Sequence, residues 1–142
     1  MKNDPVPVSD HISRYCRGGS LDSNDQPTGA SFQLGDKDEY LSVNWLELLQ
    51  LPDRDAEISE VRRVLATKLG VGGSAKLAVL NVGGVQAYVR ERSEYQLRIL
   101  HRPDEPPEFP DLSHSGIFDT ELDEMRIAQL IAQKVLETHS AK

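Results

Sequence analysis

The sequence predicts an α+β domain in which a small mixed β-sheet is packed by two main helices and by shorter ones. Residues 77–82 form a nearly continuous apolar run, which is typical of a central strand buried on both faces. Residues 55–69 and 120–138 repeat apolar side chains at helical spacing. Because 142 residues is the usual size of one domain, we expect an extended N-terminal tail over residues 1–9 and a single α+β domain over residues 10–139.

A short helix is the first element expected after the tail. Ile12, Tyr15 and Cys16 share one face at helical spacing, and Gly18 with the glycine after it would end the helix. A strand over the same residues stays open as an alternative. Residues 20–28 are rich in Ser, Asp, Asn, Gln, Pro and Gly, and we expect a loop there.

Two strands are then expected, the first over residues 30–34 and its partner over residues 40–43. The second of these is needed to bring the sheet to a stable number of strands. Asn44 is expected to cap a short helix, with Trp45 as an anchor in the core, and Pro52 would interrupt that helix.

The helix over residues 55–69 is followed by a glycine, the residue that favours helix termination. The segment after the strand at 77–82 is ambiguous. Its two glycines suit a hairpin turn, whereas the Ala, Gln, Arg and Glu content of residues 85–94 favours a short helix, and both stay open. Residues 95–101 alternate between apolar and polar side chains and are expected to form a strand.

Irregular structure is expected over residues 102–110, which hold four prolines and three acidic residues. Residues 111–118 are expected to form a second loop. Thr120, with an aspartate three residues further on, resembles a capping pair that opens the terminal helix over residues 120–138. His139 would then lie at the frayed end of that helix.

The charge balance makes binding to nucleic acid an unlikely function. The chain has 23 acidic and 16 basic residues, so its formal net charge of -7 repels phosphate backbones over most of the surface. Its single cysteine allows no intrachain disulfide or multi-thiolate zinc site, and a free thiol fits a reducing compartment. The N-terminus lacks the apolar run of a signal peptide, and no apolar run is long enough to span a membrane. We therefore expect a cytoplasmic protein.

Two glycine-rich strings, at residues 70–73 and 82–85, invite comparison with phosphate-binding loops. Neither has the spacing that such loops require, and only the second follows an expected strand, so we interpret both as turns. The histidines lack metal-binding spacing, and no serine lies in a nucleophile elbow. No metal site and no cofactor are therefore expected.

Two polar clusters are the strongest candidates for a functional site. His11 and Arg14 lie three residues apart, on one face of a helix, and suit the binding of an anion. Asp111 and His114 share a loop with two serines, and a neutral imidazole beside a carboxylate can transfer protons near neutral pH. The alternative for each cluster is a set of hydrogen bonds that only holds the local chain in place.

The string EYLSVNWLE at residues 39–47 is the most distinctive in the chain. A functional interpretation places Tyr40, Ser42 and Asn44 along a pocket. The alternative is a junction between strand and helix.

Four strings occur along the chain in the order H-x-x-R-Y, YLSVNWLE, LAVLNVG and DLSHSGI. Together they resemble a group of small uncharacterised bacterial proteins, over most of residues 10–138. The resemblance implies no activity. It adds only that the four strings recur together as landmarks.

Two functions are open at this point. The first is a non-catalytic cytoplasmic protein-interaction module, whose protein partner would dock on the proline-rich acidic segment at residues 103–111. The second is a small enzyme that acts on a nucleotide or another phosphate-bearing substrate. His11 and Arg14 would bind its anion, and His114 with Asp111 would supply acid–base catalysis. The enzyme requires both clusters to share one cleft, whereas the docking module does not.

Overall fold

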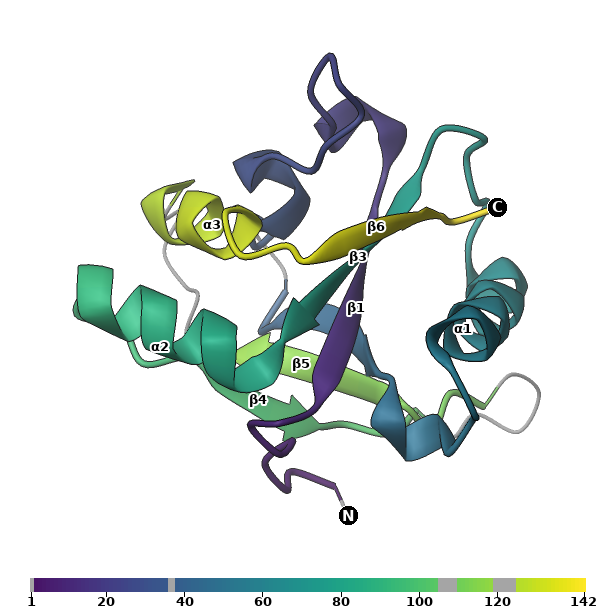
Figure 1. Ribbon diagram of the computed structural model, residues 1–142, viewed down its shortest axis with the longest axis horizontal. Helices are drawn as coiled ribbons and strands as arrows, with labels where there is room; N and C mark the ends of the chain where they lie inside the picture. Colours follow the sequence, from purple (N-terminus) through teal and green to yellow (C-terminus); the bar gives the residue numbers. More distant parts are fainter. Residues whose placement is uncertain (1, 36–37, 105–109, 119–124) are drawn as a thin grey trace.

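The computed structural model describes residues 2–35, 38–104, 110–118 and 125–142. It shows a six-stranded sheet in the order β4-β5-β2-β1-β3-β6, with helices on both sides (Figure 1). This confirms the α+β class. The sheet was expected to be mixed, but every pairing between the described strands is antiparallel.

The elements have the following bounds. The strands are β1 (His11–Cys16), β2 (Leu41–Trp45), β3 (Lys76–Asn81), β4 (Arg98–His101), β5 (His114–Phe118) and β6 (Glu137–Ser140). The helices are α1 (Arg54–Lys68), α2 (Val82–Arg92) and α3 (Met125–Ala132), and the short 3-10 turns are η1 (Gly18–Ser20), η2 (Gly29–Phe32) and η3 (Glu47–Leu49). Among the described residues, no helix has the length and apolar character needed to cross a bilayer.

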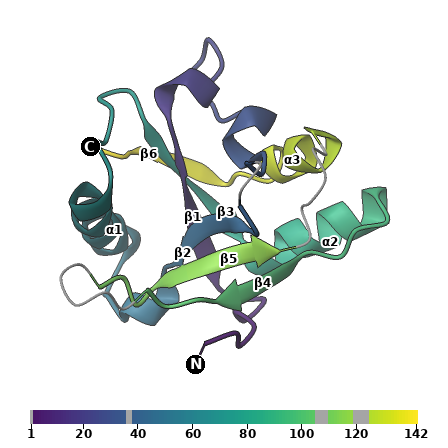
Figure 2. The ribbon, with the colours of Figure 1, turned by 180° about the vertical axis from the view of Figure 1, so that it is seen from behind.

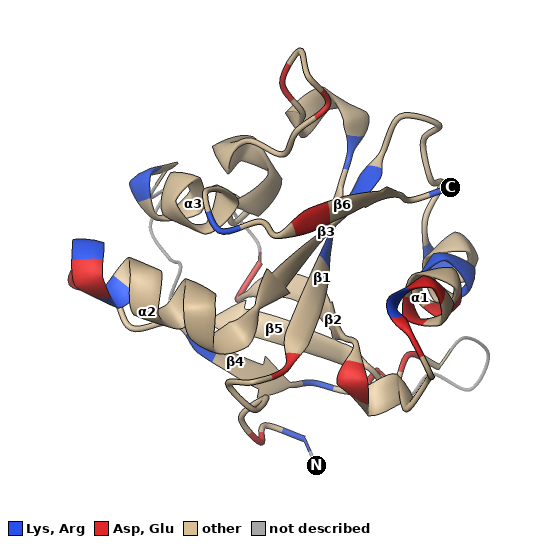
Figure 3. Ribbon diagram, viewed as in Figure 1, with Lys and Arg blue, Asp and Glu red and all other residues tan. Residues whose placement is uncertain are grey.

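Strand β3 confirms the buried central strand predicted at residues 77–82, and it separates two cores. Leu77 and Val79 pack with the apolar side of α1, whereas Ala78 and Leu80 pack with side chains of α2 and α3. This division follows from the alternation of side chains along a strand. Figure 3 shows how the charged residues are distributed over these elements. Helix α1 carries both acidic and basic residues, whereas the strands are mostly uncharged along their length.

Helix α1 confirms the helix predicted at residues 55–69, and its start is set by a capping side chain. The Asp53 carboxylate accepts a hydrogen bond from the Ala56 N–H at 2.8 Å. Helix α2 settles the ambiguous segment at residues 85–94 in favour of a helix that follows β3 directly. The Asn81 side chain caps it by accepting from the Gly84 N–H.

The first turn of α2 is not a phosphate-binding loop. The Val82 and Gly83 N–H groups donate to the Asp10 and Val8 carbonyl oxygens, so these donors are already used within the chain. A Cβ at Gly83 would lie 2.9 Å from the Val8 oxygen, which explains the glycine at this position by close approach of two backbone segments.

Residues 11–16 form a strand, as the alternative interpretation held, and not a short helix. Strand β1 pairs with β2 on one side and with β3 on the other, and these backbone bonds to distant segments outweigh the local helical spacing. Residues three apart on a strand point to opposite faces. His11 and Arg14 therefore do not share a face.

Two further segments differ from the predictions. Residues 30–34 were expected to form a strand, but η2 is a 3-10 turn in which the Ala30 N–H donates to the capping Thr28 hydroxyl. Close packing of Gly29 against Met125 and Gln129 of α3 holds this turn in place. Residues 111–118 were expected to form a loop, but β5 lies between β2 and β4, and Ser115 within it is fully buried.

The helix expected over residues 120–138 is too long. Helix α3 ends at Ala132, and β6 follows it because β3 still needs a partner on its outer edge. His139 consequently lies in β6, where it pairs with Leu77, and not at a helix end. The start predicted for the helix, at residues 119–124, lies outside the described residues.

The N-terminal segment is extended and runs along β4. The Val6 N–H donates to the Ile99 oxygen, and the His101 N–H donates to the Asp4 oxygen. Val6 is 3% exposed and belongs to the core under α2 and α3. This segment covers the outer edge of β4, an edge that would otherwise offer unpaired backbone groups.

A pair of leucine substitutions tests the assignment of the core. We expect Leu80→Ala to lower the free energy of unfolding by about 2–5 kcal/mol, because Leu80 is 0% exposed and its loss leaves a cavity. Leu136→Ala, at a leucine that is 58% exposed, should change it by less than about 0.5 kcal/mol. Urea denaturation measures both, and equal losses would contradict the placement of β3 at the centre.

Candidate functional site

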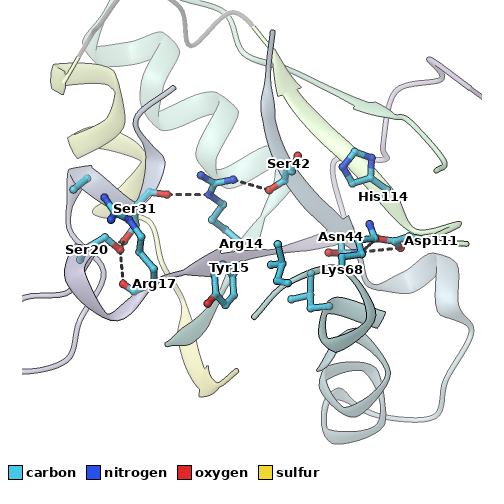
Figure 4. Close-up of a pocket in the computed structure, with 13 residues that line it drawn as sticks. Arg14, Tyr15, Arg17, Ser20, Ser31, Ser42, Asn44, Lys68, Asp111 and His114 are labelled. Atoms are coloured by element: carbon cyan, nitrogen blue, oxygen red, sulfur yellow. Dashed lines mark hydrogen bonds and ion pairs between the residues drawn. The ribbon is translucent and has the colours of Figure 1, made fainter. Parts of the chain in front are cut away.

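A cavity of about 430 Å³ lies between β1, β2, the end of α1 and the start of β5 (Figure 4). Figure 4 shows Ser20, Ser31 and Arg17 at one end, Asn44, Lys68, Asp111 and His114 at the other, and Arg14 between them. Tyr15, Ala30, Leu65 and Leu69 supply apolar wall. The volume of the cavity is in the range usual for small-molecule sites.

Arg14 occupies a gap in the sheet. The register of β1 with β2 covers only Ile12 with Trp45 and Ser13 with Asn44, although both strands continue beyond these residues. The guanidinium fills the opening: its Nε donates to the Ser31 oxygen and its Nη1 to the Ser42 oxygen, each at 2.9 Å. The arginine therefore joins η2 to β2 where the backbone pairing stops.

Burial acts on this guanidinium more strongly than any neighbouring charge. It lowers the pKa of Arg14 below the ordinary value, and the Cys16 thiol and the Asp38 carboxylate offset only part of the effect. Arginine nevertheless remains charged. Of its five N–H donors, the two bonds described above use two, and the other three have no partner among the described residues.

Arg17 adds a second cation, at the end of the cavity formed by Ser20 and Ser31. It is exposed, and its guanidinium forms no hydrogen bond or ion pair within the described part of the chain. The serines around it are hydrogen-bonded to each other and to the backbone: Ser20 Oγ donates to the Arg17 oxygen, and the Ser31 hydroxyl has Ser20 Oγ at 2.7 Å and the Ser20 oxygen at 3.2 Å as acceptors for its one proton. They hold η1 against η2 and thereby fix the wall from which Arg17 projects.

Asp111 forms a buried ionic cluster at the other end. Its carboxylate is 1% exposed and accepts hydrogen bonds from Lys68 Nζ at 2.6 Å and from Asn44 Nδ2 at 3.0 Å. Ser113 Oγ also donates to it, at 3.1 Å. Burial alone would raise the pKa of Asp111, but the bonds from Lys68, Asn44 and Ser113 together with the Lys68 charge outweigh it and lower the pKa. Asp111 is therefore ionised at neutral pH.

His114 is held in one orientation. Its Nδ1 lies 2.8 Å from the Arg102 carbonyl oxygen, which can only accept, so Nδ1 carries the proton and Nε2 keeps its lone pair in the neutral form. The Tyr40 ring packs against the imidazole with centroids 5.9 Å apart, and it stacks on Phe118 at 4.8 Å. The Tyr40 ring also stands over Gly116, where a Cβ would lie 2.3 Å from the tyrosine Cδ1.

The structure brings most of the expected site residues together and separates one. Those that line the cavity are Arg14, Ser42, Asn44, Asp111 and His114. Tyr40 lies beside the cavity, against His114. His11 is not part of the lining, because its Nδ1 pairs with the Glu47 carboxylate at 2.6 Å and its backbone N–H bonds to the same group.

Asp111 and His114 do not form the pair expected for proton transfer. Their side chains share no hydrogen bond, since Lys68, Asn44 and Ser113 occupy the carboxylate and the Arg102 oxygen occupies Nδ1. Their one link is the bond from the His114 N–H to the Asp111 backbone oxygen.

Sequence reasoning missed Arg17 and Lys68. Arg17 directly precedes the glycine pair that was taken as a helix end, and Lys68 lies in the last turn of α1, where a basic residue is ordinary. Neither position carries a signal in the sequence alone. Both enter the site only because η1 and α1 converge on β1.

The cavity is cationic in an acidic protein. Its lining holds three cations, Arg14, Arg17 and Lys68, against one carboxylate, Asp111, which leaves an excess of two positive charges with histidine neutral. The whole chain has a net charge of -7. Within the described residues, no group of three or more His, Cys, Asp or Glu side chains could hold a metal ion.

Comparison of the chain with protein-family models, curated proteins and solved structures finds no match. The resemblance to small bacterial proteins therefore stays a prediction.

A substitution at Asp111 tests the ionic cluster. We expect Asp111→Asn to lower the free energy of unfolding at pH 7 by about 3 kcal/mol, because it leaves Lys68 without its buried partner. The folded-state pKa of Asp111 is lowered, so its contribution is complete above the unfolded value near 4 and disappears as the pH falls through the folded value. Urea titrations at pH 7 and in strong acid measure the difference.

Asp104→Asn is the matched control. Asp104 lies 3.6 Å from the same lysine but is 45% exposed, so its loss should cost less than about 1 kcal/mol. The two proteins compared are Asp111→Asn and the unchanged protein. If the difference between their free energies of unfolding stayed constant from pH 7 into strong acid, Asp111 would not be ionised in the folded state.

Proposed function

We propose that this protein binds a small phosphate-bearing ligand in the cavity. The observation that supports the proposal is Arg14, a partly buried guanidinium with three N–H donors unpaired among the described residues. A charge withdrawn from water is costly unless it is paired, and planar guanidinium groups match phosphate oxygens in pairs. An anion in the cavity would supply the missing partners.

The second cation favours phosphate over a group with a single charge. Arg17 stands at the Ser20 and Ser31 end, toward which the Arg14 guanidinium reaches to bond the Ser31 oxygen, and its own donors are unpaired in the described residues. The Ser20 and Ser31 hydroxyls brace this end through bonds to each other and to the backbone. Two guanidinium groups on a braced wall suit an anion with several oxygens and up to two negative charges.

The proposed role is binding, because the geometry gives less support to acid–base catalysis. Asp111 is engaged by Lys68, Asn44 and Ser113, which leaves its carboxylate no freedom to take or give a proton. In this proposal Asp111 positions Asn44 and Lys68, and His114 contacts the ligand. An enzyme would have to rely on His114 alone for proton transfer.

The alternative of a protein-docking module stays a prediction. The segment expected to dock a partner, at residues 103–111, includes residues 105–109, which lie outside the described residues. The protein partner and the cytoplasmic location likewise remain expectations from the sequence.

Titration calorimetry with inorganic phosphate and with pyrophosphate tests the proposal. We expect binding that weakens with added salt, and we expect Arg17→Ala to reduce the affinity about tenfold, because one charge-assisted contact is lost. The Arg17 side chain forms no hydrogen bond or ion pair among the described residues, so this variant should fold. Arg14→Lys should weaken binding further, since lysine cannot make the paired contacts of a guanidinium.

Arg90→Ala is the matched control, because Arg90 is an exposed arginine on α2 and does not line the cavity. It should leave the affinity unchanged. Absence of phosphate and pyrophosphate binding to the folded protein would exclude the proposal, and so would equal losses in Arg17→Ala and Arg90→Ala.

A further inference from the structure

The two ends of the cavity differ in hydrogen-bonding character. The end at Arg14 and Arg17 presents N–H donors, as described above. At the other end, Asn44 and His114 each keep an acceptor atom that has no partner among the described residues. These two residues are directly opposite in the register of β2 with β5, so their side chains leave the sheet on the same face, side by side.

Both residues are oriented so that an acceptor remains available. Asn44 turns Nδ2 toward the Asp111 carboxylate and the Ser113 hydroxyl, an orientation fixed by chemistry because its carbonyl oxygen would repel the carboxylate. Its Oδ1 has no partner among the described residues and is not a fully buried atom. His114 commits Nδ1 to the Arg102 oxygen, which leaves the Nε2 lone pair without a partner in the described residues.

Two arrangements keep the imidazole in place. The Tyr40 ring packs on it from one side, and Gly116 provides the space for that ring over β5. Figure 2 shows β4 and β5 from a side on which no helix lies in front of them. The orientation of His114 therefore depends on these local contacts and not on a covering helix.

Among the described residues that line the cavity, Lys68 is the cation at this end, and its charge is balanced. Its Nζ lies 2.6 Å from Asp111 and 3.6 Å from Asp104. The anion is therefore attracted toward Arg14 and Arg17, which form no ion pair among the described residues, although the Asp38 carboxylate is near enough to act on Arg14. Leu65, Leu69 and Tyr15 between the two ends offer apolar contact.

We infer that the ligand is a phosphate ester whose far end carries a hydrogen-bond donor, which Asn44 Oδ1 and His114 Nε2 accept. The inference rests on the proposed function, and it adds the chemical class of the ligand. Two sources supply this chemistry: the amino group of a nucleobase in a nucleoside monophosphate, and the hydroxyl groups of a sugar phosphate.

Calorimetry at pH 8 with four probes tests the inference. The probes are inorganic phosphate, ribose 5-phosphate, adenosine monophosphate, and purine riboside 5′-monophosphate, which is adenosine monophosphate without its amino group. We expect the ester that presents the right donor to bind at least about tenfold more tightly than inorganic phosphate. Adenosine monophosphate binding more tightly than purine riboside monophosphate identifies the amino group, whereas equal binding of these two and of ribose 5-phosphate identifies the sugar hydroxyls.

Substitution of His114 separates the two ends. His114→Phe keeps a ring against Tyr40 but removes the acceptor, so the ratio of the ester affinity to the inorganic phosphate affinity, both measured in the variant, should fall toward one. Thermal unfolding of the variant reports whether the loss of the bond to the Arg102 oxygen has disturbed the fold. His139→Phe, in β6 and outside the cavity lining, is the control and should change neither affinity.

Three results would overturn the inference, and they are distinguishable. If all esters bind no more tightly than inorganic phosphate, the donor is absent and the phosphate site still stands. If His114→Phe weakens inorganic phosphate as much as the ester, the anion lies at the His114 end and the assignment of the two ends is wrong. If no probe binds, the proposed function fails together with the inference.

Discussion

Strand β3 presents buried apolar side chains at four consecutive positions, from Leu77 to Leu80, and this places a condition on the rest of the chain. A strand that is apolar on both faces must be covered on both. Helix α1 covers one face, and α2 with α3 covers the other. The neighbours β1 and β6 then satisfy its two edges, so the two layers of helices and the place of β3 inside the sheet both follow from the burial of this one strand.

The cavity lies where this regular arrangement ends. Once β1 and β2 separate, the backbone oxygen of Ser42 in β2 takes a donor from Arg14, which also bonds the Ser31 oxygen of η2. A long side chain whose planar guanidinium carries five donors can satisfy two oxygens and still present others. The arginine that holds the sheet together at this point is thus also the group with unpaired donors, and structure and proposed binding share one residue.

The parts of the fold that could be predicted from the sequence are those that local chemistry determines. Helix α1 has its own cap at Asp53 and its own apolar stripe, and β3 is apolar enough to be buried whatever surrounds it. Strands β1 and β5 depend on backbone pairing with distant segments. The helical spacing of Ile12, Tyr15 and Cys16 and the Ser–Gly content near Gly116 therefore indicated the wrong structures. The end of α3 was misplaced for the same reason, because β6 exists only as a partner of β3.

The candidate site shows the same division. Arg14 and Asp111 stood out as members of polar clusters and Asn44 as part of the most distinctive string, and the structure places them in one cavity. His11 stood out equally, yet the strand geometry of β1 directs it to Glu47. Arg17 and Lys68 look ordinary in the sequence, and they reach the cavity only through the packing of η1 and α1.

Gly116 and Tyr40 share one volume above β5, since the tyrosine ring occupies the space that a side chain at position 116 would need. The two positions are far apart in the chain and adjacent in the fold. Over evolutionary time they should therefore vary as a unit: a larger residue at position 116 would be tolerated only with a smaller one at position 40. A smaller residue at position 40 would, however, leave the imidazole of His114 without its packing partner. If the site is under selection, both positions should therefore stay constant together.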